Sequence, residues 1–190
     1  MVQATLQLNK VPRIEDPKIA LDNFNIQNQI TVSSRLEPGI DITKLTIPTC
    51  ICLDLEDLKC FEAVERQYER WGVIFHNSLA IQPSNPAFPS HSGLTVFMGA
   101  PKSGFLEATF LHPVNSVSAF VTSSQRLVLS AYDGDRQLLG QTILPGANLA
   151  NSDSAISSNT LLSISGNNIK SVTFCAFDGQ FTLDDFRFCL

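Results

Sequence analysis

The sequence has little charge and no cluster of positive charge. Charged residues make up 16% of the 190 residues, the net charge is −5, and the Lys and Arg residues are scattered singly. Proteins that bind nucleic acids or anionic membranes usually present a basic patch or stripe. The composition therefore predicts neither a nucleic-acid partner nor attachment to an anionic membrane surface.

Long apolar segments are also missing. No stretch approaches the roughly 20 apolar residues that a membrane-spanning helix needs. The N-terminal residues lack the apolar core of a secretory signal. We expect a soluble chain without membrane insertion, cytoplasmic as given or exported if a leader has been removed.

Cysteine is scarce and odd in number, with Cys50, Cys52, Cys60, Cys175 and Cys189. An odd count in a chain of this length is not typical of a disulfide framework. Reduced, buried thiols on strands are therefore one expectation. The alternative is one bridge between the Cys50/Cys52 strand and the Cys189 strand, if these strands pair. Zinc is not expected, because Cys50 and Cys52 have the wrong spacing and no histidine lies near them.

Apolar residues, in contrast, are plentiful at 44%, and 13 of them are Phe. The chain is long enough for one domain with a core filled by phenyl rings. Short apolar runs alternate with turn residues, a pattern that predicts an antiparallel β-sandwich or jelly roll over residues 49–190. The expected strands are Thr49–Leu55, Val73–Phe75, Leu94–Met98, Leu106–Leu111, Ser116–Thr122, Leu127–Tyr132, Gln137–Leu144, Leu161–Ser165, Ser171–Phe177 and Phe181–Phe188.

Turn chemistry supports several of these boundaries. Asp-Gly pairs supply the positive φ angles of tight hairpins, so Tyr132–Gln137 and Phe177–Phe181 are predicted hairpin turns. Gly166-Asn167-Asn168 is a further turn signal, and His112-Pro113 indicates a strand end. In the last strand the alternation slips by one residue at Asp184-Asp185, which predicts a β-bulge.

One segment breaks the strand pattern. Apolar residues recur every three or four positions over Asp57–Gly72, which predicts about three turns of helix ended by Gly72. Glu62 and Arg66 would form an i,i+4 pair on it. The alternative is an irregular, partly extended connection.

Residues 1–48 form a separate region, rich in proline and poor in aromatics. Two strand-like runs, Ala4–Leu8 and Gln29–Ser33, suggest an extended arm that lies on the sandwich or exchanges with a partner. A poorly ordered tail is the alternative.

Carboxylates provide the first candidate site. Glu56 and Asp57 follow the first strand of the sandwich, and Asp184 and Asp185 lie on the last. If these strands are neighbours, the four acids converge, and calcium is the natural counter-ion for such oxygens. The alternatives are a salt bridge to Arg187 or solvated acids.

Polar loops provide the second candidate. We expect loops at one end, Gln82–Ser92, Ala100–Gly104 and Gly146–Asn159, to contact a ligand through hydroxyl and amide groups. The candidate contact residues are His91, Asn85, Asn148, Asn151 and Asp153. His76 and His112 are interpreted as ordinary surface or turn residues. Because no Gly-x-Ser-x-Gly motif is present, no catalytic residue is assigned.

The order of motifs from residue 50 onward resembles the galactose-binding-like jelly rolls of bacterial surface and exported proteins. The motifs are Leu53-Asp54-Leu55-Glu56-Asp57-Leu58, Tyr68 before Gly72-Val73-Ile74-Phe75, Phe110-Leu111-His112-Pro113-Val114-Asn115-Ser116-Val117-Ser118, Leu129-Ser130-Ala131-Tyr132-Asp133-Gly134, and Phe181-Thr182-Leu183-Asp184-Asp185-Phe186-Arg187-Phe188. The resemblance implies a carbohydrate-binding module, often with a structural calcium held at Glu56, Asp57, Asp184 and Asp185.

Three functions follow from these expectations. The first is a non-catalytic module that binds carbohydrate or another polar surface ligand. The second is an assembly protein whose N-terminal arm adds a strand to a neighbour and makes a homo-oligomer. The third is a glycoside-active enzyme, which would need a cleft with an acid and a base that the sequence does not reveal.

Overall fold

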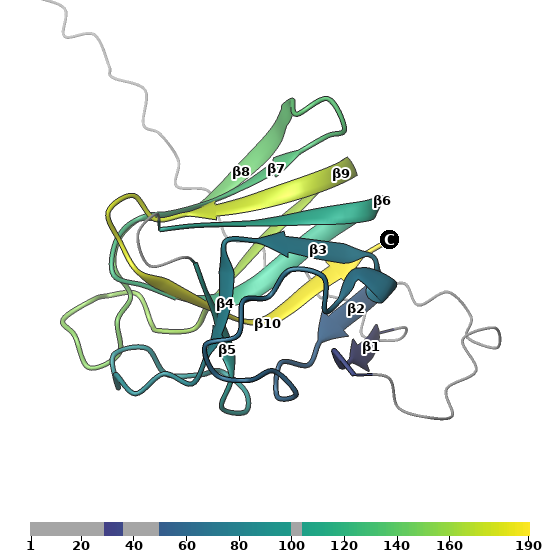
Figure 1. The fold of residues 1–190 in the computed structure, drawn as a ribbon. Helices are drawn as coiled ribbons and strands as arrows, with labels where there is room; N and C mark the ends of the chain where they lie inside the picture. Colours follow the sequence, from purple (N-terminus) through teal and green to yellow (C-terminus); the bar gives the residue numbers. More distant parts are fainter. Residues whose placement is uncertain (1–28, 36–49, 100–103) are drawn as a thin grey trace, which may run out of the picture.

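The computed structural model describes residues 29–35, 50–99 and 104–190. Its strands are β1 Gln29–Val32, β2 Cys50–Leu53, β3 Val73–His76, β4 Ser78–Ile81, β5 Val96–Gly99, β6 Phe105–Ser123, β7 Leu127–Tyr132, β8 Leu138–Leu144, β9 Thr160–Cys175 and β10 Phe181–Cys189, and η3 Glu69–Trp71 is a single 3₁₀ turn (Figure 1). Within these ranges no helix is long and apolar enough to span a membrane.

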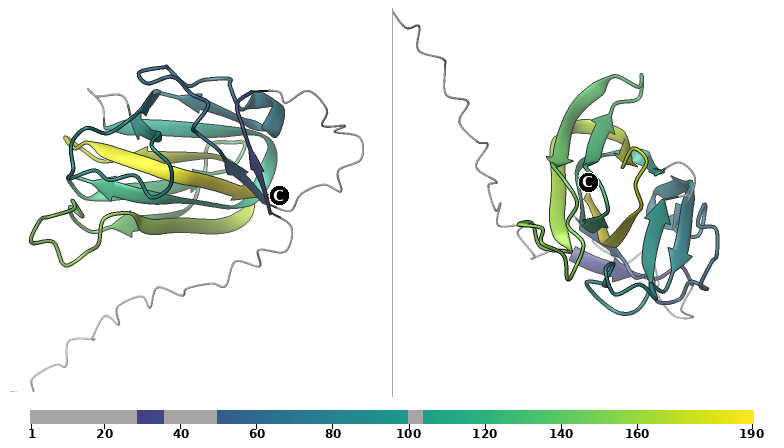
Figure 2. Two further views of the ribbon diagram at one scale, coloured as in Figure 1. Left: turned by 90° about the horizontal axis from the view of Figure 1, so that it is seen from below. Right: turned by 90° about the vertical axis from the view of Figure 1, so that its left-hand side faces the viewer.

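The two long strands, β6 and β9, belong to both layers of a β-sandwich. They pair with each other along most of their length, in antiparallel register. The first half of β6 also pairs with β3, and the second half of β9 pairs with β7, which continues to β8. The second half of β6 pairs with β10, which continues to β2 and β5. The strands therefore curve around a common interior (Figure 2).

The change of layer occurs where the sequence predicted turns. The β6–β9 register shifts between Thr109 and Val114 and again before Ser116. His112-Pro113 thus lies inside β6, and Gly166-Asn167-Asn168 lies inside β9 with Asn168 at φ 62°. The predicted strand end and turn were wrong, because the residues that make turns also make the bulges at which a long strand bends.

Phenyl rings from both layers meet in the core, as the composition predicted. Phe174 of β9 lies 6.4 Å from Phe186 of β10, and Phe75 of β3 lies 5.2 Å from Phe186, measured between ring centroids. Phe110 of β6 packs against Phe188 at 5.2 Å. All of these rings are almost fully buried. The alternating inward residues of two layers therefore form one hydrophobic core.

The predicted helix over Asp57–Gly72 was wrong, and the irregular connection is correct. Only Glu69–Trp71 turns helically, although Gly72 does end that turn in the left-handed conformation. Backbone groups of residues 61–65 bond instead to residues 75–80, for example Val64 N–H to the Ser78 carbonyl at 2.9 Å. Arg66 pairs with Glu69 rather than Glu62. Neighbouring strands thus satisfy the backbone groups that a helix would have bonded internally.

One predicted hairpin is confirmed and the other was wrong. Strands β7 and β8 pair across residues 132–138, but the positive φ falls on Arg136 rather than Gly134. The turn at 177–181 joins β9 to β10, and these strands lie on opposite sides of β6 instead of pairing. Long-range pairing with β6 decides the partners of these strands.

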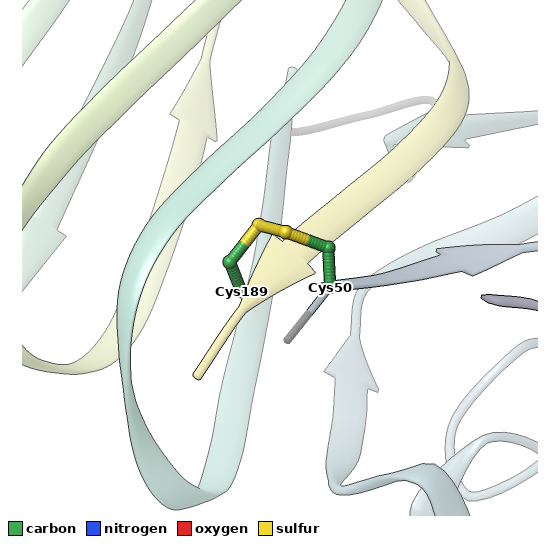
Figure 3. Close-up of a disulfide and its surroundings, with 2 residues drawn as sticks. All are labelled: Cys50 and Cys189. Atoms are coloured by element: carbon green, nitrogen blue, oxygen red, sulfur yellow. A yellow bond between two sulfur atoms is a disulfide. The ribbon is translucent and has the colours of Figure 1, made fainter. Parts of the chain in front are cut away.

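The first and last strands of the sandwich are neighbours. Antiparallel β2 and β10 bring Cys50 opposite Cys189, and a disulfide joins them (Figure 3). Cys52, Cys60 and Cys175 are free thiols. The predicted bulge is confirmed, because the β10–β6 register shifts between Asp184 and Arg187, and Asp185 has a φ of 46°.

Part of the N-terminal region joins the sheet. Strand β1 lies beside β2 in parallel, within the predicted run Gln29–Ser33. It is the parallel exception in a sandwich whose other described pairs are antiparallel. The run Ala4–Leu8 lies outside the described residues, as does most of the loop Ala100–Gly104.

Candidate functional site

Two of the predicted polar loops lie against each other at one end of the sandwich. The backbone N–H of Ala150 donates to the carbonyl of Ala87 at 3.0 Å, which joins the segment 82–95 to the segment 145–159. Asn85, Asn151 and Asp153 are exposed on these segments. The side chain of Asn85 accepts a hydrogen bond from Ala87 N–H at 3.0 Å, so it also shapes its own turn.

Asn148 is placed differently from its neighbours. It is fully buried, and its amide accepts from Ser123 N–H at 2.7 Å. The same amide donates to the carbonyls of Val121 and Ser157, both at 2.9 Å. In this structure Asn148 anchors its loop to β6 and is not available to a ligand.

His91 lies beside the acids of the last strand. Its ring stacks on Phe120 of β6, with centroids 3.5 Å apart and planes within 9°. Its Nδ1 lies 2.8 Å from Oδ2 of Asp185. The ring is partly exposed, with 39% of the side chain accessible. Stacking and the carboxylate contact together hold the imidazole in one orientation.

Asp184 is the buried member of the acidic doublet, with 4% of the residue exposed. Its Oδ2 accepts hydrogen bonds from the backbone N–H groups of His91, at 2.7 Å, and Ser92, at 2.9 Å. Its Oδ1 accepts from Asp185 N–H at 2.8 Å. Burial raises the pKa of this carboxyl above its ordinary value, and the three N–H donors oppose that shift.

Glu56 binds the same loop from the other side. Its Oε1 accepts from the N–H groups of Leu94, at 3.0 Å, and Thr95, at 2.9 Å. Gly93 fits beneath this carboxylate at a φ of 55°, because a Cβ there would lie 2.2 Å from Oε1. The segment 91–95 is therefore held by Glu56, near the start of the domain's sequence, and by Asp184, near its end.

These groups line a cavity of about 240 Å³, here called the acidic pocket. Its walls come from β1, β2, β10 and the segments that follow β2 and precede β5. The residues that line it are Gln29, Thr31, Cys52, Leu53, Asp54, Leu55, Glu56, Ser92, Thr95, Asp184, Asp185 and Arg187. Glu56, Asp184 and Asp185 thus converge as the sequence predicted, whereas Asp57 is not among the lining residues.

Most oxygens of the predicted calcium ligands are engaged in other contacts. Over the described ranges no three His, Cys, Asp or Glu residues are placed to hold a metal. Oxygens of Asp184 and Glu56 already accept backbone N–H groups, and Asp57 lies outside the cavity near Arg35 N–H. Calcium needs six to eight convergent oxygens. Calcium binding stays a prediction that has not been tested.

Cys52 and Arg187 face each other across β2 and β10 beside this pocket. Burial raises the pKa of the Cys52 thiol, and the Arg187 charge opposes that rise. The thiol is therefore protonated at neutral pH, which makes it a poor nucleophile.

A second polar surface, absent from the sequence expectations, lies on the outer face of the other layer. Strand register aligns one residue from each of five strands, and each member points away from the core. The row consists of His76, Glu107, Thr173, Ser130 and Gln141. Together with the adjacent Tyr132, Arg136 and Ser171 it is called here the polar face.

Interactions across the polar face order its side chains. Arg136 forms an ion pair with Glu107, and its Nη1 lies 3.3 Å from the Ser171 hydroxyl. The same guanidinium lies over the Tyr132 ring, 5.6 Å from its centroid. Gln141 donates to the Ser130 hydroxyl at 2.9 Å. Ser130, Ser171 and Thr173 are themselves nearly buried.

Local sequence signals did not reveal this face. Each member is one polar residue on a strand whose other side is apolar, a pattern that is ordinary for a sandwich. These residues lie far apart in the sequence, and only the pairing of β3, β6, β9, β7 and β8 sets them in one row. The available signal was the Tyr132 ring beside the Arg136 turn.

Comparison with known proteins gives only distant similarity. No family model matches the sequence, and no curated protein matches it. A CBM61 module solved in complex with β-1,4-galactotriose is similar, with 14% identity, a TM-score of 0.37, and coverage of 65% of this chain and 94% of that one. A DUF4465 family protein from Bacteroides caccae has 11% identity and a TM-score of 0.38, and the match covers 63% of this chain and 82% of that one. The CBM22-1 xylan-binding domain of Paenibacillus barcinonensis Xyn10C has 13% identity and a TM-score of 0.33, and the match covers 69% of this chain and 90% of that one. We therefore derive the function from the residues of this chain.

Proposed function

We propose that the protein is a non-catalytic carbohydrate-binding module that uses the polar face. The observation that supports this is a row of polar side chains across five adjacent strands, in which His76 and Gln141 are exposed, beside the Arg136–Glu107 ion pair and one aromatic ring. A sugar ring has hydroxyls at its edge and an apolar face. Planar amide, carboxylate and guanidinium groups bond the hydroxyls, and an aromatic ring packs against the apolar face.

The dimensions favour an oligosaccharide rather than a single sugar. Neighbouring strands are about 4.8 Å apart, so a row across five strands is roughly 19 Å long. Such a length accommodates several linked sugar rings. The module is expected to bind rather than cleave them, because Glu107, the carboxylate of this row, is already engaged by Arg136.

The experiment is a glycan array followed by titration calorimetry with the best ligand. Tyr132→Ala should weaken binding by at least about tenfold, because it removes both an apolar contact for a sugar ring and the support of the Arg136 guanidinium. Gln141→Ala, at an exposed edge position, should weaken it about threefold without disturbing the core. Longer oligosaccharides should bind more tightly than the monosaccharide.

A matched control is Phe61→Ala. Phe61 is 78% exposed on the connection before β3 and is not a member of the polar face. It should leave binding unchanged while removing an aromatic ring of similar size. Equal losses in Phe61→Ala and Tyr132→Ala, or flat binding to every glycan, would contradict the proposal.

The second candidate function is assembly through the N-terminal arm. It is supported by β1, in which residues of that region already add a strand to the β2 edge. Exchange of this strand between copies would produce a homo-oligomer. Deletion of residues 1–32 should then convert an oligomer to a monomer in light scattering. The same mass with and without the arm would exclude this function.

A further inference from the structure

We propose that the acidic pocket binds a polyhydroxylated primary amine, the chemical class of an amino sugar. This site is distinct from the polar face. The first reason is charge, because the pocket walls carry the carboxyl groups of Asp54, Glu56, Asp184 and Asp185 against the single guanidinium of Arg187. A cavity with this balance attracts a cation and repels an anion.

The second reason is that two carboxylates have an oxygen to offer. Glu56 uses Oε1 for the two loop N–H groups, and Asp54 uses Oδ1 for Glu56 N–H at 3.0 Å. Among the described residues the other oxygen of each accepts no hydrogen bond. Asp184 and Asp185 are fully engaged with the segment 91–92 and contribute negative potential instead. An ammonium group donates three hydrogen bonds, which suits the free oxygens of Asp54 and Glu56.

The third reason is a pair of buried polar atoms with no partner in the described residues. Oγ1 of Thr95, in a residue that is 1% exposed, and Nε of Arg187 both lack a hydrogen bond, and both residues line the pocket. Unpaired buried polar groups are rare in folded proteins and usually indicate a missing ligand or water. Nε needs an acceptor, and Thr95 can bond a hydroxyl. A ligand that carries hydroxyls as well as the amine satisfies both.

The pocket's size and geometry favour an organic cation over a metal ion. No three metal-binding groups converge in the described ranges, so the negative charge is distributed over the walls. A volume of about 240 Å³ holds a ligand of several heavy atoms rather than a bare ion. A single sugar ring with an ammonium substituent has both the size and the charge distribution.

The test compares glucosamine, N-acetylglucosamine and glucose, which differ in one substituent, by NMR titration at pH 6. Glucosamine should bind. N-acetylglucosamine and glucose should bind at least about tenfold more weakly, because a charge-assisted hydrogen bond is lost. The galactosamine series tests whether ring stereochemistry matters. Binding of the amine should weaken as sodium chloride rises, because exposed charges are screened.

Two isosteric variants assign the site. Glu56→Gln and Asp54→Asn each keep an oxygen that can accept the hydrogen bonds now donated by backbone N–H groups, so both variants should fold. Each should weaken amine binding about fivefold or more. Glu65→Gln, an exposed residue outside the pocket, makes the same charge change and should have no effect. Circular dichroism of each variant confirms the fold.

Three outcomes would overturn the proposal. They are equal binding of the amine and the acetamide, unchanged amine binding in both pocket variants, and tight calcium binding at Asp54 and Glu56 with no preference for an amine. Failure of the polar-face function is distinguishable, because Tyr132→Ala tests that face and should leave amine binding in the pocket intact.

Discussion

Asp184 accepts a hydrogen bond from Ser92, although 92 residues separate them in the chain. This 2.9 Å contact joins the bulge of the last strand to the loop before β5. The buried carboxylate thereby sets the wall shared by the acidic pocket and the His91–Phe120 stack.

The pH dependence of stability should report the burial of Asp184. Its folded-state pKa lies above the ordinary value of 3.8, so the folded state holds the proton more tightly than the unfolded state. The resulting stability is fully present below pH 3.8 and is lost as pH rises through the raised pKa. Urea titrations of the wild type and Asp184→Asn should therefore show the wild type's relative stability falling over that window. If the unfolding free energy of the wild type minus that of Asp184→Asn rose with pH, the prediction would be contradicted.

Asp184→Asn should also be destabilised by about 1–3 kcal/mol at pH 7. Its amide nitrogen would face one of the N–H donors of residues 91, 92 and 185, and two donors cannot bond each other. Asp178→Asn, an exposed position, is the control and should change the urea midpoint little.

The disulfide should stabilise the fold by restricting the unfolded chain. It joins Cys50 and Cys189, 139 residues apart, so it closes a long loop. Replacing both with Ala should cost about 2–5 kcal/mol in chemical denaturation under oxidising conditions. Cys60→Ala removes an exposed thiol and should be neutral. A thiol assay should count three free thiols per wild-type chain.

Asn148→Ala should strongly destabilise the loop that ends β8. Removing the amide takes away the partner of Ser123 N–H, of the buried Val121 carbonyl and of the partly buried Ser157 carbonyl. We expect a loss of about 2–5 kcal/mol. The exposed Asn167→Ala should lose less than about 0.5 kcal/mol. Similar losses in the two variants would contradict the anchoring role.

Gly104→Ala should be severely destabilising. Gly104 has a φ of 54°, and a Cβ there would lie 2.1 Å from the Ala176 carbonyl oxygen, which belongs to the backbone. Gly146→Ala meets nothing within 4 Å and has an ordinary φ, so it should retain its stability or gain a few tenths of a kcal/mol. Thermal unfolding of the two variants compares them directly.

Much of the fold was predictable from local pattern. Alternation placed most strands, and the slip at Asp184-Asp185 located a real bulge. The irregular course of Asp57–Gly72 was not predictable, because the backbone groups of this segment bond to β3 and β4 residues that no local window contains. The same limit applies to His112-Pro113, where a turn signal became a bend in β6.

The candidate sites divide in the same way. The sequence named Glu56, Asp184, Asp185 and His91 as candidates, because acids at two strand ends and a histidine in a polar loop can be recognised by residue type, and the structure places them close together. It did not reveal that Asn148 is buried or that Arg136 meets Glu107.

By itself, then, the sequence determined which side chains face the core and which residues bend the chain, since alternation and turn chemistry act over a few residues. Tertiary structure alone decided which strands pair, that Cys50 meets Cys189, and which polar residues share a surface. The physical reason is that strand pairing is made by backbone hydrogen bonds, which are chemically alike at every residue. Packing of the whole core selects among the pairings, and it sets the carboxylates of residues 54–56 and 184–185 around one pocket.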